Sequence, residues 1–381
     1  MDFSLTTEQR ELRDATAEFA RRTLTDDLRG RDRRSEFSRE FWNRCAEFGI
    51  QGLPIPEAYG GRGFDTLTTV LAMEALGEEC RDNGLLFGIN AQMWSVEMPI
   101  LRFGTERQKE RYLRPMCDGT MIGAHAMSEP SAGSDAFSLR TIARRRGECY
   151  VLNGSKTFVS NAPVADFFIV FASLDLAQGA LGLTAFVVDR STPGLRVSQP
   201  IHKMGLTTSP MAELFFEDCE VPVESRLGRE GRGASIFNDS MEWERGCILA
   251  GFLGSMKRQL DTCVRYARER RQFDKPIGEF QSVSNRLVQM RLRLDTSRLL
   301  VYRAAWAKQQ AGSASTEAAL AKLYVSEAML QSALDAVQIH GGYGFTTEYE
   351  VERDVRDAVG GRLYSGTSDI QAAIIARSLG F

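Results

Sequence analysis

Features that would mark a specialised class of protein are missing from this 381-residue sequence. The 47 lysines and arginines are balanced by 50 aspartates and glutamates, and the net charge of −3 leaves no basic surplus for nucleic-acid binding. No apolar run approaches the roughly 20 residues of a membrane-spanning helix. A charged amphipathic segment begins almost at once, with no signal-peptide hydrophobic region before it. We therefore expect a globular cytoplasmic protein without a membrane or nucleic-acid partner.

Disulfide and metal patterns are also missing. The seven cysteines are odd in number, widely scattered and never arranged as CxxC, which argues against a disulfide framework or a zinc site. The three histidines, His125, His202 and His340, stand in unrelated contexts, so no histidine-based metal centre is predicted. What is present is ordinary for a globular protein: 43% hydrophobic and 25% charged residues, over a length that suits two or three domains.

The first part of the chain has the pattern of an α-helical domain, which we predict over residues 1–118. A Thr-Thr-Glu-Gln capping start stands at Thr6, and apolar residues follow it at helical spacing. The same signal recurs at 38–49 and 65–80, and Thr105 begins another charged helix.

From residue 119 the pattern changes to short extended segments, and we predict a middle antiparallel β domain over 119–230. Residues 150–159 alternate around Asn153-Gly154, which favours a hairpin turn at that dipeptide. Further apolar strands, separated by glycine and proline, are expected at 167–172, 183–188 and 212–216.

Helical patterns then return and continue to the end of the sequence, which predicts a third domain over 231–381 resembling a four-helix bundle. We expect its helices at 235–268, 279–311, 316–339, 349–357 and 367–378. The predicted fold is therefore mainly α with a central β domain.

The segment SMEWERG at 240–246 carries a carboxylate in an unusual setting. One helix face is shared by Glu244, Cys247, Ile248 and Gly251, and it continues through Gly254 and Ser255. Burial on this small and mostly apolar face should raise the pKa of the Glu244 carboxyl, as a general base near neutral pH requires. The alternatives are a Glu244–Arg245 pair at a solvated helix start, or a carboxylate at the helix dipole. The segment alone leaves both interpretations open.

Two glycine-containing segments have the composition of cofactor loops. AMSEPSAGSD at 126–135 offers hydroxyls and backbone N–H groups to a flavin ring edge or a phosphate. QIHGGYGF at 338–345 follows a helix with a turn where the backbone can approach a diphosphate closely. With these motifs in a helical–β–helical order, the sequence resembles the acyl-CoA dehydrogenase family over essentially the whole chain.

This resemblance implies FAD as the cofactor and assigns residues to it by matching position. Those implied to line the isoalloxazine ring are Met127, Ser128, Ser134, Phe158 and Ser160. In a segment similar to the family's Glu-Arg-x-x-Phe, Arg270 and Phe273 are implied to reach the FAD of a neighbouring subunit. Those implied at the adenosine diphosphate end are Gln281, Gln338, Gly341 and Gly342. Thr367 and Asp369 match the stretch that closes over the cofactor. The family's usual assembly, a homotetramer built as a dimer of dimers, is implied as well.

One departure from the family pattern decides the expected chemistry. The commonest motif is Tyr-Glu-Gly-Thr, with the glutamate as base, whereas this sequence has YSGT at 364–367. Serine cannot take an α-proton at neutral pH without help. A minority of the family, including the isovaleryl type, carries the base before an arginine on the helix after the β domain, where Glu244 and Arg245 stand. The resemblance thus implies Glu244 as base, Ser365 acting only through its backbone N–H on the thioester carbonyl, and Arg245 and Gly366 beside the substrate.

Within the family, the sequence most resembles the L-prolyl-carrier-protein dehydrogenases, on segments 161–166, 238–247, 280–286, 300–306 and 365–371. The implied reaction is α,β-dehydrogenation of an L-prolyl thioester on a peptidyl carrier protein, toward a pyrrole-2-carboxyl thioester. Because segment 339–345 is closer to ordinary acyl-CoA members, a short branched-chain acyl-CoA dehydrogenase is an alternative. A flavin monooxygenase of the same fold would leave Glu244 unexplained, and a non-catalytic binding role would require FAD to be absent.

Overall fold

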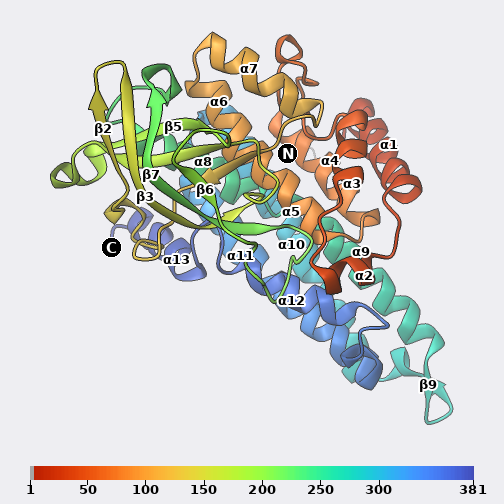
Figure 1. Cartoon of the computed structure of the whole chain (residues 1–381). Coiled ribbons are helices and arrows are strands. Elements are labelled where there is room, and N and C mark those ends of the chain that lie inside the picture. The colour runs from red at the N-terminus through yellow and green to blue at the C-terminus, as the bar shows by residue number, and fades with distance from the viewer. Residues whose placement is uncertain (1–3) are drawn as a thin grey trace.

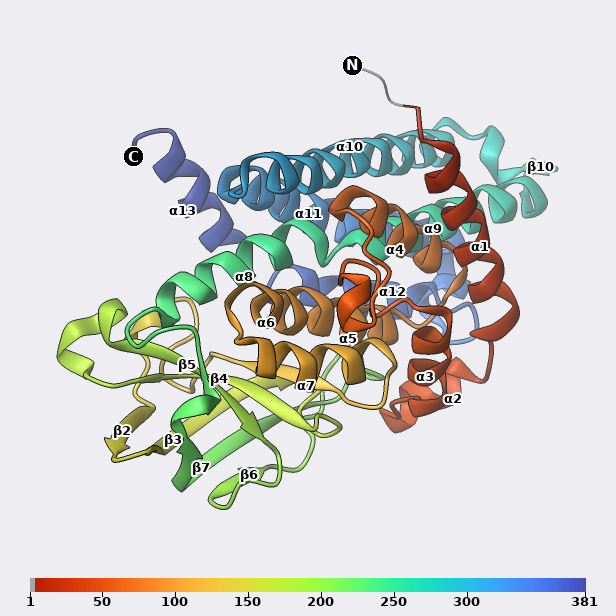
Figure 2. The ribbon, with the colours of Figure 1, turned by 90° about the horizontal axis from the view of Figure 1, so that it is seen from above.

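The computed structural model describes residues 4–381. Its β-sheet lies at one side of the molecule, and helices from the two ends of the chain pack together beside it (Figure 1). Seen from above, the sheet lies at one end and the long helices α10 and α11 extend along the molecule to the other (Figure 2). Among the described residues, none of the helices combines the length and apolar character that crossing a bilayer requires.

The N-terminal region is helical, as predicted. Its elements are α1 (Thr7–Thr23), α2 (Leu28–Arg34), α3 (Arg39–Phe48), α4 (Thr66–Glu79), α5 (Asn83–Gln92), α6 (Met98–Phe103) and α7 (Glu106–Cys117), with a 3-10 turn η1 (Glu57–Tyr59) and a π-helical turn η2 (Met93–Glu97). The predicted helix starts at Thr6 and Thr105 are confirmed, because each threonine forms a capping box with a glutamine three residues on. Helix α4 is buried on nearly all sides, so it forms the centre of this region.

The central region is a sheet of eight strands. They are β1 (Gly123–Ala126), β2 (Ile142–Arg146), β3 (Cys149–Ser160), β4 (Phe167–Ser173), β5 (Leu183–Asp189), β6 (Leu195–Val197), β7 (Met211–Pro222) and β8 (Arg226–Leu227), with 3-10 turns η3 (Ala136–Ser138), η4 (Leu176–Gly182) and η5 (Val223–Ser225). The order is β6-β7-β3-β2-β4-β5-β8, and β1 also pairs with β4. Most pairs are antiparallel, but β1 and β2 run parallel to β4. These two strands follow one another along the same edge of β4, so both take the same direction.

The predicted hairpin turn at Asn153-Gly154 is wrong. Strand β3 continues straight through this dipeptide, and the turn that joins β2 to β3 lies at residues 147–148. Gly154 instead sits at an irregularity in the pairing with β7, where its φ is +146° and an added Cβ would lie 2.6 Å from the Thr141 hydroxyl oxygen. An Asn-Gly pair suits a bulge as well as a turn, since both use backbone angles that glycine permits.

The C-terminal region is again helical. Its elements are α8 (Gly233–Cys247), α9 (Ala250–Glu269), α10 (Gln281–Ala311), α11 (Ser315–His340), α12 (Val351–Gly361) and α13 (Ser368–Ser378), with a small hairpin of β9 (Arg271–Gln272) and β10 (Lys275–Pro276) and 3-10 turns η6 (Ile277–Glu279) and η7 (Gly341–Phe345). The single helix predicted over 235–268 is wrong, because the chain breaks between α8 and α9 at Leu249, whose φ and ψ are −85° and 3°.

Close packing against α4 explains this break. An added Cβ on Gly254 would lie 2.1 Å from the Glu74 carbonyl oxygen, and one on Gly77 would lie 1.9 Å from the Gly251 carbonyl oxygen. The small residues of α9 therefore bring two helix backbones together. After the break α9 follows α4, whereas Glu244 on α8 lies against Ser95 of η2 and Ser365 of the turn before α13.

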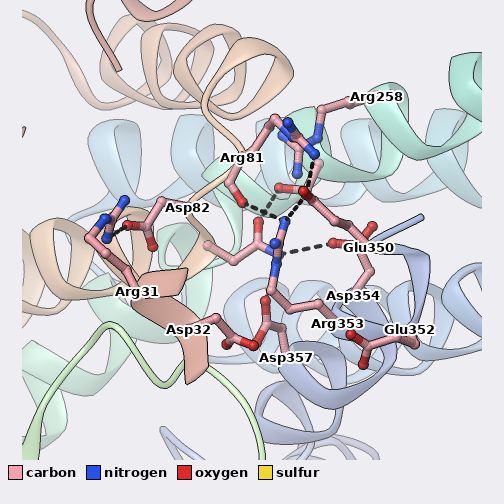
Figure 3. Close-up of polar contacts among 12 residues, drawn as sticks. Arg31, Asp32, Arg81, Asp82, Arg258, Glu350, Glu352, Arg353, Asp354 and Asp357 are labelled. Carbon is pink, nitrogen blue, oxygen red and sulfur yellow. Dashed lines mark hydrogen bonds and ion pairs between the residues drawn. The ribbon is translucent and has the colours of Figure 1, made fainter. Parts of the chain in front are cut away.

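A network of buried and partly buried charges joins the three regions. We call it the junction cluster and define it by Arg31, Asp82, Glu350, Arg353 and Asp357 (Figure 3). Arg31 Nη1 lies 2.7 Å from Asp82 Oδ2, and Arg353 Nη2 lies 3.1 Å from Glu350 Oε2. The Asp357 carboxylate accepts hydrogen bonds from the backbone N–H of Leu206 (2.6 Å) and the amide of Asn83 (2.9 Å). These contacts connect α2, the start of α5, the loop before β7 and α12.

Candidate active site

A cavity of about 1240 Å³ lies between the sheet, α5, α8 and the turn that precedes α13. Of the site residues expected from the sequence, those that line it are Met127, Ser128, Ser134, Phe158, Ser160, Glu244, Arg245, Ser365, Gly366 and Thr367. Segments more than 200 residues apart in the chain thus meet at one cavity, which is large enough to hold more than a single small ligand.

Glu244 lies in the wall of this cavity and is only 8% exposed. It stands in the last turn of α8, which begins at Gly233, so the alternatives of a solvated helix start and an N-terminal dipole carboxylate are wrong. Burial raises the pKa of the Glu244 carboxyl above its usual value, although two hydroxyl donors and the charges of Arg245 and Lys322 act in the opposite direction.

The two hydroxyl donors come from distant segments. Ser95 Oγ donates to Glu244 Oε2 at 2.6 Å, and Ser365 Oγ donates to Glu244 Oε1. The sequence assigned Ser365 a role through its backbone N–H alone, so its side-chain contact is a difference from that expectation. Ser95 was not foreseen at all.

Ser95 reaches Glu244 because η2 lies directly against α8. The neighbouring residues Trp94 and Trp243 stack with ring centroids 5.9 Å apart and planes at 6°, so two successive side-chain pairs join these elements. Phe87, Ala91 and Ser95 follow at intervals of four residues and all line the cavity. A π-helical turn inside a helix frequently marks a functional site, and here it adjoins the buried carboxylate.

The turn that bears Ser365 is held by its carbonyl groups. Arg245 Nε donates to the Ser365 carbonyl at 3.0 Å, and Lys322 Nζ donates to the Gly366 carbonyl at 2.7 Å. The Gln371 amide lies 3.1 Å and 2.9 Å from the same two oxygens. Ser365 and Gly366 have φ values of +56° and +87°, which makes glycine the favoured residue at the second position. Arg245 thus holds the turn that faces the cavity.

Lys322 is completely buried on α11, and burial together with the nearby Arg245 lowers its pKa to about 8. Among the described residues, Glu244, Arg245 and Lys322 form no ion pair within 4.0 Å. The sequence analysis missed Lys322, although its position among the buried residues Ala318, Ala319 and Val325 of one helix was a usable signal. We call Ser95, Glu244, Arg245, Lys322 and Ser365 the cavity cluster.

The other expected cofactor residues do not line the cavity. They are Arg270, Phe273, Gln281, Gln338, Gly341, Gly342 and Asp369. Except for Asp369, an exposed residue in the first turn of α13, they lie at the end of α9, in the loop of the small hairpin, at the start of α10, at the end of α11 and in η7, at the opposite end of the molecule from the sheet (Figure 2). There the Arg270 guanidinium lies 5.5 Å from the Tyr343 ring centroid, and Phe273 is 88% exposed. Within a single chain, the expected cofactor residues that line the cavity and those that do not are therefore far apart.

A large cavity enclosed by two helical regions and a sheet, with a buried carboxylate in its wall, is the arrangement of an enzyme that removes a proton from a bound organic substrate. Comparison with known protein families supports this interpretation. The acyl-CoA dehydrogenase N-terminal domain matches residues 6–120, the middle domain 124–219 and the C-terminal domain 231–380. The chain belongs to the acyl-CoA dehydrogenase family.

Individual relatives narrow the comparison. An L-prolyl-[peptidyl-carrier protein] dehydrogenase of Pseudomonas fluorescens is 45% identical over 351 residues, which cover 92% of each chain. The crystal structure of the prolyl acyl carrier protein oxidase AnaB has 49% identity and a TM-score of 0.98, covering 99% of this chain and 100% of AnaB. The structure of PigA with FAD and proline has 41% identity and a TM-score of 0.97, covering 100% of this chain and 99% of PigA.

Proposed function

We propose that this protein is an FAD-dependent dehydrogenase that oxidises an L-prolyl thioester on a peptidyl carrier protein toward the pyrrole-2-carboxyl thioester. The similarity to proteins that act on prolyl carrier-protein thioesters supports the substrate. The observation that carries the chemistry is the buried Glu244 in the cavity wall, facing a turn in which Ser365 occupies the family's commoner base position.

The cavity wall suits a flat, hydrogen-bonding cofactor such as FAD. Phe158 presents an aromatic ring that is 63% exposed, on a backbone with a φ of +57°. The hydroxyls of Ser128, Ser134 and Ser160, which also line the cavity, can bond ring-edge or phosphate atoms. When bound, FAD would accept the β-hydrogen as hydride, two electrons at a time, so reaching the pyrrole would take two dehydrogenations, with the flavin reoxidised by oxygen or an electron-transfer partner after each.

In the proposed mechanism, Glu244 takes the α-proton of the thioester. Its desolvated carboxylate is a stronger base than an exposed one, which matches proton abstraction near neutral pH. The Ser365 N–H polarises the thioester carbonyl, on a turn that Arg245 and Lys322 hold by its carbonyl groups. Gly366 lets the backbone approach the substrate closely, and the surrounding helices exclude water from the base.

We propose further that the second group of cofactor residues acts on a partner subunit in a homotetramer. An exposed apolar stripe on α10 supports such an assembly: Val288 (61%), Leu292 (56%), Leu299 (53%) and Trp306 (56%) recur at intervals of four and seven residues. The exposed Phe273, with Arg270, would then reach the FAD of a partner subunit, whereas Gln281, Gln338, Gly341 and Gly342 would contact its adenosine diphosphate end. Asp369 would close over it from the first turn of α13.

The domain limits 1–118, 119–230 and 231–381 remain part of the proposal. The family matches at 6–120, 124–219 and 231–380 support limits near these positions. The elements agree with them, since α7 ends at Cys117 and α8 begins at Gly233.

The alternative substrate is a short branched-chain acyl-CoA, because the isovaleryl type of this family uses the same base position. The deciding experiment offers the FAD-loaded protein L-prolyl-carrier protein or isovaleryl-CoA and follows the loss of hydrogen mass from the acyl group. We expect oxidation of the prolyl group only. Oxidation of isovaleryl-CoA with an unchanged prolyl group would refute the proposed substrate, and oxygen insertion would favour the monooxygenase alternative.

A further inference from the structure

In the cavity cluster, the proposed base is Glu244, and the residue at the family's commoner base position is a serine that contacts it. The commoner family base position, 365, holds a serine, and this serine now donates a hydrogen bond to the glutamate that stands 121 residues earlier. Ser95, 149 residues before Glu244, donates to the other carboxylate oxygen at 2.6 Å. Each oxygen of one buried carboxylate therefore has its own hydroxyl donor.

We propose that Ser95 and Ser365 are positioning residues that each donate a hydrogen bond to one carboxylate oxygen of Glu244. These hydrogen bonds favour the ionised carboxylate inside an apolar wall. They also fix the direction of its free lone pairs. This inference rests on the proposed function, in which Glu244 is the base. It goes beyond that function because it assigns the two hydroxyls a role through Glu244, to which each donates a hydrogen bond.

The geometry gives the hydroxyls this role because they are the only side-chain hydrogen-bond donors to Glu244 among the described residues. A hydroxyl that donates to a carboxylate favours the ionised form over the protonated form. Burial acts in the opposite direction, so the two hydroxyls offset part of the desolvation of Glu244. Two donors from separate elements also leave the carboxylate little freedom to rotate.

Other titratable groups lie on the elements around Glu244. Their effect on its protonation must be distinguished from that of the Ser95 and Ser365 hydroxyls. Arg245 on α8 and Lys322 on α11 favour the ionised carboxylate by their charge. The turn before α13 contributes Tyr364, whose pKa burial raises well above its usual value, so the phenol stays neutral. On η2 the buried Glu97 bonds to Gln92 at 2.8 Å, and burial raises its pKa to about 8. Neither serine substitution removes any of these charges.

Ser240 provides a matched control. It lies on α8 one turn before Glu244, is fully buried, and donates its hydroxyl to the Phe237 carbonyl at 2.8 Å. Ser240→Ala therefore removes a buried hydroxyl of the same helix without touching the carboxylate. Ser95→Thr keeps a hydroxyl at the donor position and tests rescue.

The experiment titrates Glu244 in the FAD-loaded protein without substrate. Infrared difference spectra between each variant and its Glu244→Gln counterpart, with 13C-labelled glutamate, report the protonation midpoint of this one carboxyl. Hydrogen bonds to charged groups contribute roughly 1.5–3 kcal/mol, which is about 1–2 pH units. We expect Ser95→Ala and Ser365→Ala each to move the midpoint upward by about 1 unit, and the double variant to move it further.

The rate of prolyl oxidation should follow the same order. In each alanine variant the ascending limb of the pH profile of kcat/KM moves up with the infrared midpoint, while Ser95→Thr and Ser240→Ala remain near the unmodified protein. Midpoints unchanged in both alanine variants, or shifted equally by Ser240→Ala, would overturn the inference. If the unmodified protein does not oxidise the prolyl thioester, the proposed substrate fails, yet the infrared titration still decides the role of the two hydroxyls.

Discussion

The junction cluster and the cavity cluster both contain buried charged side chains, but these charges are satisfied in different ways. At the junction, Arg31 lies against Asp82 and Asp26, and Arg353 lies against Glu350. In the cavity cluster, Glu244 receives only hydroxyl hydrogen bonds, and Lys322 donates to a carbonyl. Charges at the junction are neutralised by direct pairing, which suits a structural role. Those at the cavity are left partly uncompensated, which suits proton transfer.

The electrostatic consequence of this difference can be seen in single groups. The Asp82 and Asp26 carboxylates help raise the pKa of Arg31 beyond its usual range, despite the burial of the guanidinium. Lys322 has no such carboxylate partner, and its pKa falls to about 8. Arg31, which has carboxylate partners, therefore stays protonated, whereas burial of Lys322 without an ion-pair partner among the described residues brings its pKa close to physiological pH.

Removing the unpaired carboxylate should have the largest effect. Glu244→Gln keeps the shape but cannot accept the α-proton, so we expect kcat/KM for prolyl oxidation to fall about 10³-fold or more, while FAD stays bound. Mass spectrometry of the acyl group and the flavin absorbance measure the two quantities. The control Glu220→Gln removes an exposed carboxylate from β7 and should leave the rate unchanged. Near-normal turnover in Glu244→Gln would remove this residue from the mechanism.

Breaking an ion pair of the junction cluster should lower the stability of the protein and not its catalytic rate. Arg31→Met leaves Asp82 buried without its cation, which we expect to cost about 3–5 kcal/mol. A thermal melt of the FAD-loaded protein measures the shift. The exposed pair of Arg291 and Asp295 offers a matched comparison, because Arg291→Met should cost no more than about 1 kcal/mol. Equal shifts in the two variants would contradict a structural role for the junction.

Lys322→Met tests the cation of the cavity cluster. The variant loses the hydrogen bond to the Gly366 carbonyl and a positive charge that favours ionised Glu244, so we expect about a tenfold loss of kcat/KM with little change in melting temperature. Lys257→Met, on the outer side of α9, is the control. A large loss of stability without a kinetic effect would place Lys322 with the structural charges.

We expect the smallest effect at Asp357. This residue differs from the other charges of the junction cluster, because its carboxylate accepts two hydrogen bonds but forms no direct ion pair with any residue that the structure describes. Burial raises its pKa from 3.8 to about 6. The folded state therefore binds this proton more tightly, and the stabilisation is fully present below pH 3.8 and is lost as the pH rises through 6. Between pH 7 and pH 5, we expect the unmodified protein to gain about 1 kcal/mol relative to Asp357→Asn, measured by paired thermal melts. A pH-independent difference would contradict the raised pKa.

Much of the fold could be predicted from the sequence, because it depends on residues that are neighbours along the chain. The capping boxes at Thr6 and Thr105 follow from four-residue patterns, and the long helices follow from apolar periodicity. The hairpin at Asn153-Gly154 failed for the opposite reason. The same dipeptide fits a turn or a bulge, and only pairing with β7 decides between them.

Some features of the candidate site could likewise be predicted from the sequence, and others could not. Periodicity left the setting of Glu244 open, and the family resemblance then favoured it as the base beside the loop at 126–135, part of which lines the cavity. The sequence could not supply Ser95, because a π-helical turn has no simple sequence pattern that would show which way its serine points. It also could not supply the break at Leu249, which depends on how closely α9 approaches α4.

By itself, the sequence determined the succession of helical, β and helical regions, and its family resemblance singled out one carboxylate as the base. Only the tertiary structure decided what surrounds that carboxylate: a hydroxyl 149 residues before it, another 121 residues after it, and a buried lysine on a third helix. Local patterns fix backbone conformation because they act within a few residues. The pKa and the orientation of a buried group are set by whichever side chains the packing of distant elements brings within hydrogen-bond distance.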